Sequence, residues 1–139
     1  MLDSNIIAKL VLNEPNSKEA RATIENHIKK GYTLHTSDIA LPECLNVIWK
    51  HANLFADLNQ EDIKSTTLYL LKVYDALAVT PTRDIAHQAI EIAQTTKVAA
   101  YDAIYIALTQ KLNGTLYTAD KKLSTTAETI TETKLLKPT

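Results

Sequence analysis

The chain has 139 residues, of which 45% are hydrophobic and 22% are charged, and its formal net charge is −1. These values are typical of one globular domain and exclude an intrinsically disordered chain. The single cysteine, Cys44, excludes an intrachain disulfide and a cysteine-rich zinc module. No apolar run reaches the roughly 18 residues of a membrane span and no leader pattern is present, so we expect a cytoplasmic protein without membrane contact. The near-neutral charge leaves nucleic-acid binding open without supporting it.

The first half of the chain alternates short strand-like segments with amphipathic helices. Cap-like residues precede each apolar run, and Pro or Gly follows the first two helices. A strand stub over residues 1–3 comes first, followed by a helix that Ser4 or Asn5 caps and Pro15 ends. The second helix starts at Asn16 and Glu19, which resemble a capping box, and closes at Gly31. A strand over 32–36 and a helix opened by Ser37 or Asp38 follow.

The second half repeats this alternation. It begins with a helix opened by Asn59 and Asp62, a short strand at Val79 and a helix from Thr82 to Thr95. The next helix has Tyr101, Tyr105, Leu108 and Leu112 on its inward face, and Gly114 stops it. A strand over 115–118, a helical turn over 120–123 and a last strand over 134–136 follow. No repeat, low-complexity segment or linker divides the sequence. We therefore predict a single α/β domain over residues 1–139, with a small, mostly parallel sheet between two layers of helices.

Four acidic residues fall where this arrangement brings chain segments together. Asp3 follows the first strand, Glu43 lies early in a helix, Asp102 starts an apolar helix, and Asp120 follows the strand over 115–118. The carboxyl ends of parallel strands share one edge of a sheet, which is where ligands bind. Two carboxylates about 5 Å apart repel by roughly 3 kcal/mol at an effective dielectric of 20. An all-oxygen cluster of this kind favours Mg²⁺ or Mn²⁺, so the pattern predicts a candidate metal site.

Each acid also has a purely structural interpretation. Asp102 could favour the dipole of its helix, and Asp120 could cap the turn that follows it. Glu43 shares its helix face with polar residues, as a solvated side chain does. The four histidines show no ligand spacing, Cys44 is interpreted as an inert core thiol, and Tyr101 and Tyr105 are interpreted as core or interface residues. Spacing alone leaves the metal site and the structural roles equally open.

Three segments together resemble the PIN domain family, and most closely its VapC-type toxins. They are LDSNIIAKL near the start, PECLNVIWK in the middle, and YDAIYIALTQKLNGTLYTADKKL towards the end. The resemblance implies a PIN-like three-layer α/β/α fold. It also implies Asp3, Glu43, Asp102 and Asp120 as the catalytic acids, with Asp3, Asp102 and Asp120 as metal ligands and Glu43 acting through water. Ser4 and Thr118 match the supporting hydroxyl residues.

Two departures from the family pattern stand out. Only Met1 and Leu2 precede the first acid, so either the first strand is short or the true chain begins upstream. Ala99 occupies a position where Ser or Thr is common before the third acid. Neither departure removes a carboxylate.

The resemblance implies a Mg²⁺-dependent endoribonuclease, with Mn²⁺ as a substitute ion, that cleaves single-stranded RNA. It also implies the toxin of a toxin–antitoxin pair, a homodimer, and a small antitoxin that inserts near the acids. We expect partner contacts on the helices between Asn59 and Thr95, which carry Leu68, Leu71, Tyr74 and Ile85. A phosphatase of the haloacid-dehalogenase type is disfavoured, because that pattern has a second Asp two residues after the first and position 5 is Asn. The alternative that stays open is a non-catalytic PIN-like scaffold that binds RNA or protein.

Overall fold

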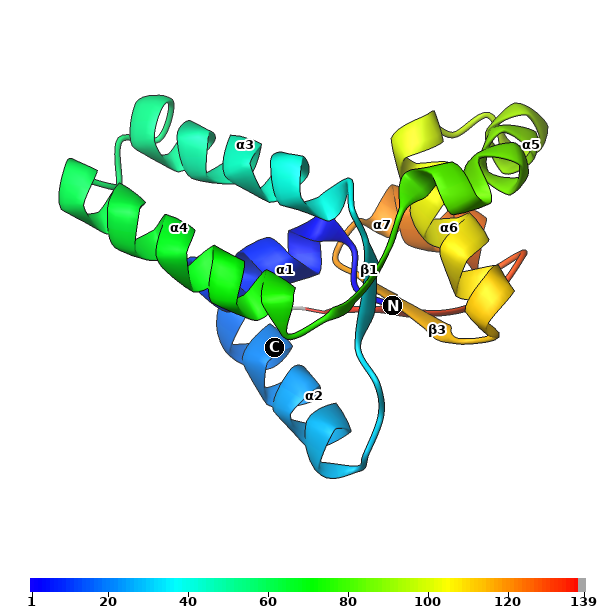
Figure 1. Cartoon of the computed structure of the whole chain (residues 1–139), viewed down its shortest axis with the longest axis horizontal. Coiled ribbons are helices and arrows are strands. Elements are labelled where there is room, and N and C mark those ends of the chain that lie inside the picture. Colours follow the sequence, from blue (N-terminus) through cyan, green and yellow to red (C-terminus); the bar gives the residue numbers. More distant parts are fainter. Residues whose placement is uncertain (138–139) are drawn as a thin grey trace.

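Short parallel strands run through the middle of the molecule, and helices surround them (Figure 1). The computed structural model describes residues 1–137. In Figure 1, α1 to α4 gather on one side of the strands, and α5 and α6 lie on the other. The elements are α1 (Ser4–Val11), α2 (Ser17–Lys29), β1 (His35–Ser37), α3 (Ala40–Asn53), α4 (Gln60–Asp75), β2 (Ala78–Thr80), the 3₁₀ helix η1 (Thr82–Ile85), α5 (Ala86–Thr96), α6 (Ala100–Leu112), β3 (Thr115–Thr118), α7 (Lys121–Ala127) and β4 (Glu132–Leu135).

The strands form two parallel pairs that the N-terminal residues connect. Strand β1 pairs with β2, and β3 pairs with β4. Between these pairs, the Leu2 amide donates to the His35 carbonyl at 2.9 Å, and the Tyr117 amide donates to the Met1 carbonyl at 2.8 Å. Leu2 and Tyr117 form a parallel bridge. The predicted α/β fold with a small parallel sheet is therefore confirmed, and the carboxyl ends of the strands lie at one edge.

Helix α6 is the most deeply packed helix of the described residues. Every residue from 103 to 109 is buried, as in a helix with apolar neighbours on all sides. At its two ends, Tyr101 is 62% exposed and Leu112 is 39% exposed. The predicted inward stripe is therefore correct for Tyr105 and Leu108 and wrong for its two ends. The buried centre of α6 anchors Asp102, in its first turn, at the edge of the core.

The first helix begins one residue earlier than the sequence analysis expected. Asp3, rather than Ser4 or Asn5, is the cap of α1, because its side chain accepts a hydrogen bond from the Ile6 amide at 3.0 Å. The first candidate acid therefore has a structural role of its own. By contrast, Asn59 caps α4 as predicted.

Several other element boundaries also differ from the prediction. Asp38 does not open α3, because its side chain accepts hydrogen bonds from the backbone and hydroxyl of Thr82. Asn16 adopts a left-handed conformation and makes no capping hydrogen bond with its side chain. At the end of α6, the residue with the left-handed conformation is Asn113, and Gly114, predicted to stop the helix, follows it. The second strand runs over His35–Ser37 instead of 32–36, and the helix predicted from Thr82 begins as η1.

The expected partner face is only partly exposed. Leu68 is 57% exposed and Leu71 is 39% exposed, whereas Ile85 is fully buried and belongs to the core. The inclusion of Ile85 in a contact surface was therefore wrong. In residues 1–137, no helix has the length and apolar character needed to cross a bilayer.

Candidate functional site

Three of the four candidate acids line one small cavity at the carboxyl edge of the strands. Asp3 reaches it from the start of α1, Glu43 from the first turn of α3, and Asp102 from the first turn of α6. The cavity has a volume of about 190 Å³. We call it the acid pocket; its remaining lining residues are Ser4, Asn5, Asn46, Val47, Lys50, Tyr105 and Leu123.

Asp3 is the most constrained carboxylate of the acid pocket. It is 2% exposed, and its Oδ1 accepts the capping hydrogen bond from Ile6, whereas its Oδ2 is buried and has no hydrogen-bond partner among residues 1–137. Burial raises the pKa of Asp3 to about 7, the charges of Asp120 and Glu43 add to this increase, and the nearby Thr118 hydroxyl and the Ile6 amide offset part of it. An ionised carboxylate in this position is costly until a proton or a cation compensates its charge.

Glu43 is held by a tyrosine that the sequence analysis did not assign to the site. The Tyr105 hydroxyl donates to Glu43 Oε1 at 2.6 Å, and the ring of Tyr105 is 2% exposed. Burial and the adjacent Glu43 carboxylate raise the pKa of Tyr105, while the Ser4 hydroxyl lowers it. The phenol is therefore a permanent donor in the neutral pH range. The signal that could have identified it is its spacing of three residues from Asp102, which places both on one helix face.

Asp102 and Asp120 differ in how firmly their carboxylates are held. Asp102 is half-buried, and burial followed by the negative charges of Asp120 and Glu43 raises its pKa, against a lowering effect of Lys122. Asp120 lies beside the acid pocket but caps α7, where its Oδ1 accepts from two backbone amides at 2.9 and 3.1 Å. The Asp120 amide in turn donates to the hydroxyl of Thr118, at the end of β3, at 3.0 Å. The capping role considered for Asp120 is therefore present.

The family model for the PIN domain matches residues 1–129. The chain belongs to the PIN domain family. It is 34% identical over 125 residues to Ribonuclease VapC3 from Pyrobaculum aerophilum, a match that covers 89% of this chain and 91% of the relative.

Two solved structures share the fold at lower sequence identity. PAE2754 from Pyrobaculum aerophilum has a TM-score of 0.66 at 20% identity, with 95% of this chain and 86% of that chain covered. FitAcB from Neisseria gonorrhoeae has a TM-score of 0.59 at 21% identity, with 95% and 94% covered. Both likenesses show that this PIN domain has the fold expected from its sequence.

The acid pocket of this PIN domain fits a divalent cation by its chemistry more than by its present side-chain positions. Its carboxylates supply only oxygen ligands, and Asp3 Oδ2 is an acceptor that no described residue pairs with. Within residues 1–137, however, no three His, Cys, Asp or Glu side chains are grouped so that they could hold an ion. The carboxylates repel one another, which favours side-chain positions that keep them apart. A cation that neutralises them removes this repulsion. The ligands therefore need side-chain rotations to converge on an ion.

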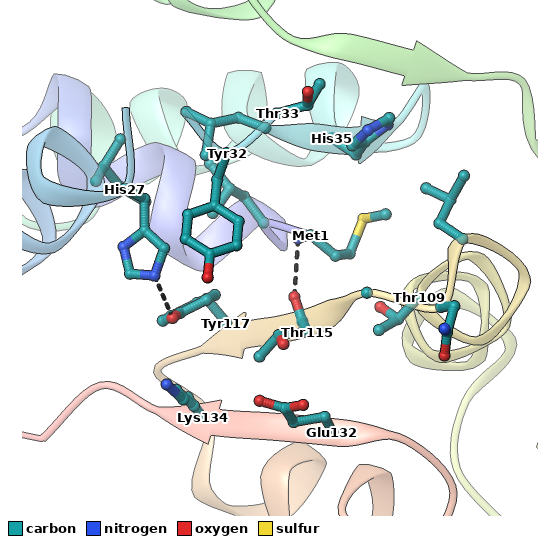
Figure 2. Close-up of a pocket in the computed structure, with 16 residues that line it drawn as sticks. Met1, His27, Tyr32, Thr33, His35, Thr109, Thr115, Tyr117, Glu132 and Lys134 are labelled. Atoms are coloured by element: carbon teal, nitrogen blue, oxygen red, sulfur yellow. Dashed lines mark hydrogen bonds between the residues drawn. The ribbon is translucent and has the colours of Figure 1, made fainter. Parts of the chain in front are cut away.

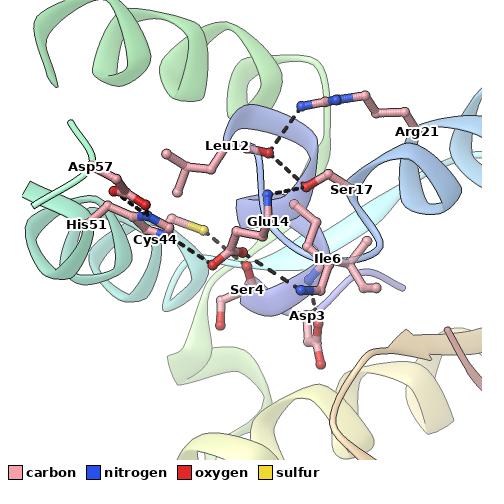
Figure 3. A network of polar contacts seen from close by, with 11 residues as sticks. Asp3, Ser4, Ile6, Leu12, Glu14, Ser17, Arg21, Cys44, His51 and Asp57 are labelled. Atoms are coloured by element: carbon pink, nitrogen blue, oxygen red, sulfur yellow. Dashed lines mark hydrogen bonds and ion pairs between the residues drawn. The ribbon is translucent and has the colours of Figure 1, made fainter. Parts of the chain in front are cut away.

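A second group of carboxylates in the PIN domain is arranged differently (Figure 3). His51, near the end of α3, contacts Asp57 through Nδ1 at 2.9 and 3.0 Å and Glu14 through Nε2 at 2.9 Å. Burial alone would lower the pKa of His51, but the hydrogen bonds and charges of the two carboxylates outweigh it and raise that pKa. We call these three residues the histidine network. These contacts give His51 a structural role, in line with the lack of ligand spacing among the histidines.

Cys44 is a buried thiol between the first and third helices. It is 1% exposed, and its Sγ donates to the Ser4 carbonyl at 3.4 Å (Figure 3). Burial, and secondarily the charge of Glu43, raise the pKa of Cys44 to about 12. The thiol is therefore unreactive in the folded protein, in line with its interpretation as a core residue.

Proposed function

We propose that this PIN-domain protein is a metal-dependent endoribonuclease of the VapC type that cleaves single-stranded RNA. The observation that carries the proposal is the acid pocket, where the buried Asp3 Oδ2 has no hydrogen-bond partner in the described part of the chain and the carboxylates of Glu43, Asp102 and Asp120 lie around it. The relative named Ribonuclease VapC3, which matches most of the chain, supports the same activity. Mg²⁺ is the proposed ion, and Mn²⁺ is a substitute with the same preference for oxygen ligands.

The four acids then divide into three metal ligands and one base. Asp3, Asp102 and Asp120 would hold the ion, and Glu43 would orient the attacking water and accept its proton. When bound, the ion supplies charge stabilisation at the phosphate and makes a bound water more acidic. Thr118 supports this arrangement by fixing the Asp120 backbone and by lying beside Asp3, and Ser4 supports it next to Tyr105.

The acid pocket also carries a candidate contact for the RNA backbone. Lys50, one of its lining residues, is exposed, and among residues 1–137 it forms no ion pair. Such a cation can neutralise a phosphate that approaches the carboxylates. A nuclease with this feature loses substrate affinity as salt increases, which a binding measurement at two ionic strengths tests directly.

We also propose that the protein is the toxin of a toxin–antitoxin pair, acts in the cytoplasm and forms a homodimer. Exposed apolar side chains support partner contacts, because Leu68 and Tyr69 on α4 are 57% and 53% exposed. Beside them a groove of about 640 Å³ lies between α2 and α4, lined in part by Ile28, Tyr69 and Val73. Co-purification with a small protein encoded by a neighbouring gene tests the pairing. Light scattering on the purified protein tests the dimer, and a monomeric mass contradicts it.

The second candidate is a PIN-like scaffold that binds RNA or protein without cutting it. It is favoured by one observation: Asp3 and Asp120 cap helices and Glu43 accepts from Tyr105, so three acids have structural partners. A protein that binds RNA and cuts none with either ion is the scaffold. The two candidates therefore give opposite results in the same assay.

The decisive experiment is a cleavage assay on defined single-stranded RNAs with Mg²⁺, with Mn²⁺ and with a chelator. We expect cleavage by the parent with either ion and none with the chelator or in the Asp102→Asn variant. Equal cleavage by the parent and by Asp102→Asn, with matching circular dichroism spectra, refutes the metal-site assignment.

A further inference from the structure

We propose that Tyr105 is a positioning residue that holds one oxygen of Glu43, so that the other oxygen stays directed to the ion and its water. This inference rests on the proposed nuclease function, because it concerns the same acid pocket. It adds a residue that is not one of the proposed ligands and that acts through Glu43.

The first support is the position of Tyr105 on α6. Asp102 and Tyr105 are three residues apart, so the acid and the phenol lie on the same face of the helix, and both line the acid pocket. The residues around Tyr105 on α6 are buried, which fixes the direction of its ring. Its hydroxyl then reaches across to α3 and contacts a residue 62 positions earlier in the chain.

The second support is that Glu43 has no other anchor. The bond from Tyr105, at 2.6 Å, is the one hydrogen bond to the Glu43 carboxylate among residues 1–137. Glu43 lies in the first turn of α3, where its neighbours in the acid pocket, Asn46 and Lys50, are exposed. A free glutamate in such a place samples several rotamers, and fixing it on binding costs entropy. The phenol removes part of that cost in advance.

The third support is the chemistry of the contact. A phenol that donates to a carboxylate engages one oxygen and leaves the second oxygen's lone pairs available. The same arrangement, in which a buried donor orients an acid that serves an ion, is common around metal sites, and its loss costs about 10–100-fold in metal affinity or activity.

The test compares Tyr105→Phe with a matched variant, Tyr117→Phe. The Tyr117 hydroxyl also makes a hydrogen bond of 2.6 Å, with His27 Nε2, but this bond lies beside a different cavity of about 360 Å³ (Figure 2). That cavity lies at the amino ends of the strands, with His35, Thr115 and Glu132 in its lining. Each variant removes one hydroxyl, retains the ring, and deletes one hydrogen bond of the same length.

The primary readout is the affinity for Mn²⁺ alone, measured by calorimetry without RNA. We expect Tyr105→Phe to weaken Mn²⁺ binding about 10-fold, and Tyr117→Phe to leave it unchanged. With Mg²⁺ and RNA, Tyr105→Phe should lower kcat and leave KM for RNA near the parent value, because no substrate contact is removed. Parent-like Mn²⁺ affinity in Tyr105→Phe overturns the inference.

A double-mutant cycle with Glu43→Asp shows whether Tyr105 acts through Glu43. Asp keeps the charge, so Mn²⁺ binding stays measurable, but its side chain is too short to meet the phenol. We expect Glu43→Asp to weaken binding by itself and to abolish the further effect of Tyr105→Phe. Equal effects of Tyr105→Phe on Mn²⁺ affinity in both backgrounds overturn the inference. If Tyr105→Phe does not fold, a parent-like Mn²⁺ affinity of Glu43→Asp overturns it instead. A parent that neither binds Mn²⁺ nor cuts RNA refutes the proposed function itself, whereas a parent that does both confines any failure to Tyr105.

Discussion

Helix α3 contributes one residue to each of two carboxylate groups, Glu43 near its start and His51 near its end, and the difference between these groups shows how an acid cluster is recognised as a site. Near its end, His51 lies between Glu14 and Asp57, and each of these carboxylates is within 3.0 Å of an imidazole nitrogen. Near its start, Glu43 shares the acid pocket with Asp3 and Asp102, and none of the three forms an ion pair within residues 1–137. The first group is complete by itself. The second group has no such ion-pair partner among these residues, so acidity without a paired cation is the distinguishing feature, and it is the basis for the proposed metal site.

The strongest test of this comparison is to remove one carboxylate from each group. Asp102→Asn should lower metal-dependent RNA cleavage by about 100-fold or more, because it removes a proposed ligand of the ion. Asp57→Asn changes a carboxylate of the histidine network in the same way and should leave the rate unchanged. A single-turnover cleavage assay measures both. A large loss in Asp57→Asn erases the distinction between the two groups.

The cost of burying the Asp3 charge should make the stability of the protein depend on pH. The pKa of Asp3 is about 7 in the folded protein against an ordinary value of 3.8, so the folded state retains the proton more strongly than the unfolded state. The free energy of unfolding should therefore fall as the pH rises between these two values, by on the order of a few kcal/mol.

Asp3→Asn isolates this contribution, because an amide does not ionise and its oxygen can still accept from the Ile6 amide. In chelator, the variant should be more stable than the parent above pH 7, and its advantage should vanish toward pH 4. Urea unfolding at several pH values measures the difference. A difference that stays constant over this range contradicts the assignment of the buried charge.

Metal binding should compensate this cost in one group only. At Mn²⁺ concentrations of about 100 times Kd, ligand binding stabilises the parent by about 2.7 kcal/mol. Asp57→Asn should keep this increase in Tm, and Asp102→Asn should lose it. Without metal, Asp102→Asn should be as stable as the parent or more stable, since one repulsive charge is gone. Thermal unfolding with and without Mn²⁺ provides the measurement, and a full metal shift in Asp102→Asn refutes the model.

The smallest expected effect concerns the histidine network. The pKa of His51 is raised in the folded protein, so the network stabilises the fold fully below the unfolded pKa and loses this contribution as the pH rises through the folded pKa. His51→Gln should therefore destabilise the protein by about 1 kcal/mol at pH 6 and by less at pH 9. His87→Gln, on the exposed surface of α5, is the control. A loss that grows with pH contradicts the charged form of His51.

The sequence predicted the features that depend on local pattern. Strand β3 occupies the predicted residues, Asn59 caps α4 as expected, and the strand–helix alternation brings Asp3 and Asp102 to one edge. The choice among Asp3, Ser4 and Asn5 as a cap was not decidable locally, because all three side chains are suitable caps. Packing decides it, since Ser4 is already helical and buried.

What the sequence could not predict depends on contacts between distant segments. Tyr105 and Glu43 are 62 residues apart, and Glu14 and His51 are 37 apart. No periodicity within one helix records such a pair, because the relative placement of α1, α3 and α6 decides it. For this reason the sequence supports only a core or interface role for Tyr105, and the contact of its hydroxyl with Glu43 comes from the fold.

The placement of Cys44 allows its thiol to report on the separation of α1 from α3. The protein has one thiol, and that thiol is enclosed where α1 meets α3, immediately after Glu43 in the sequence and against the backbone of Ser4. An alkylating reagent can reach it only when these two helices separate. The rate of thiol labelling therefore measures how often α1, which follows Asp3, and α3, which carries Glu43, move apart, and no engineered probe is needed.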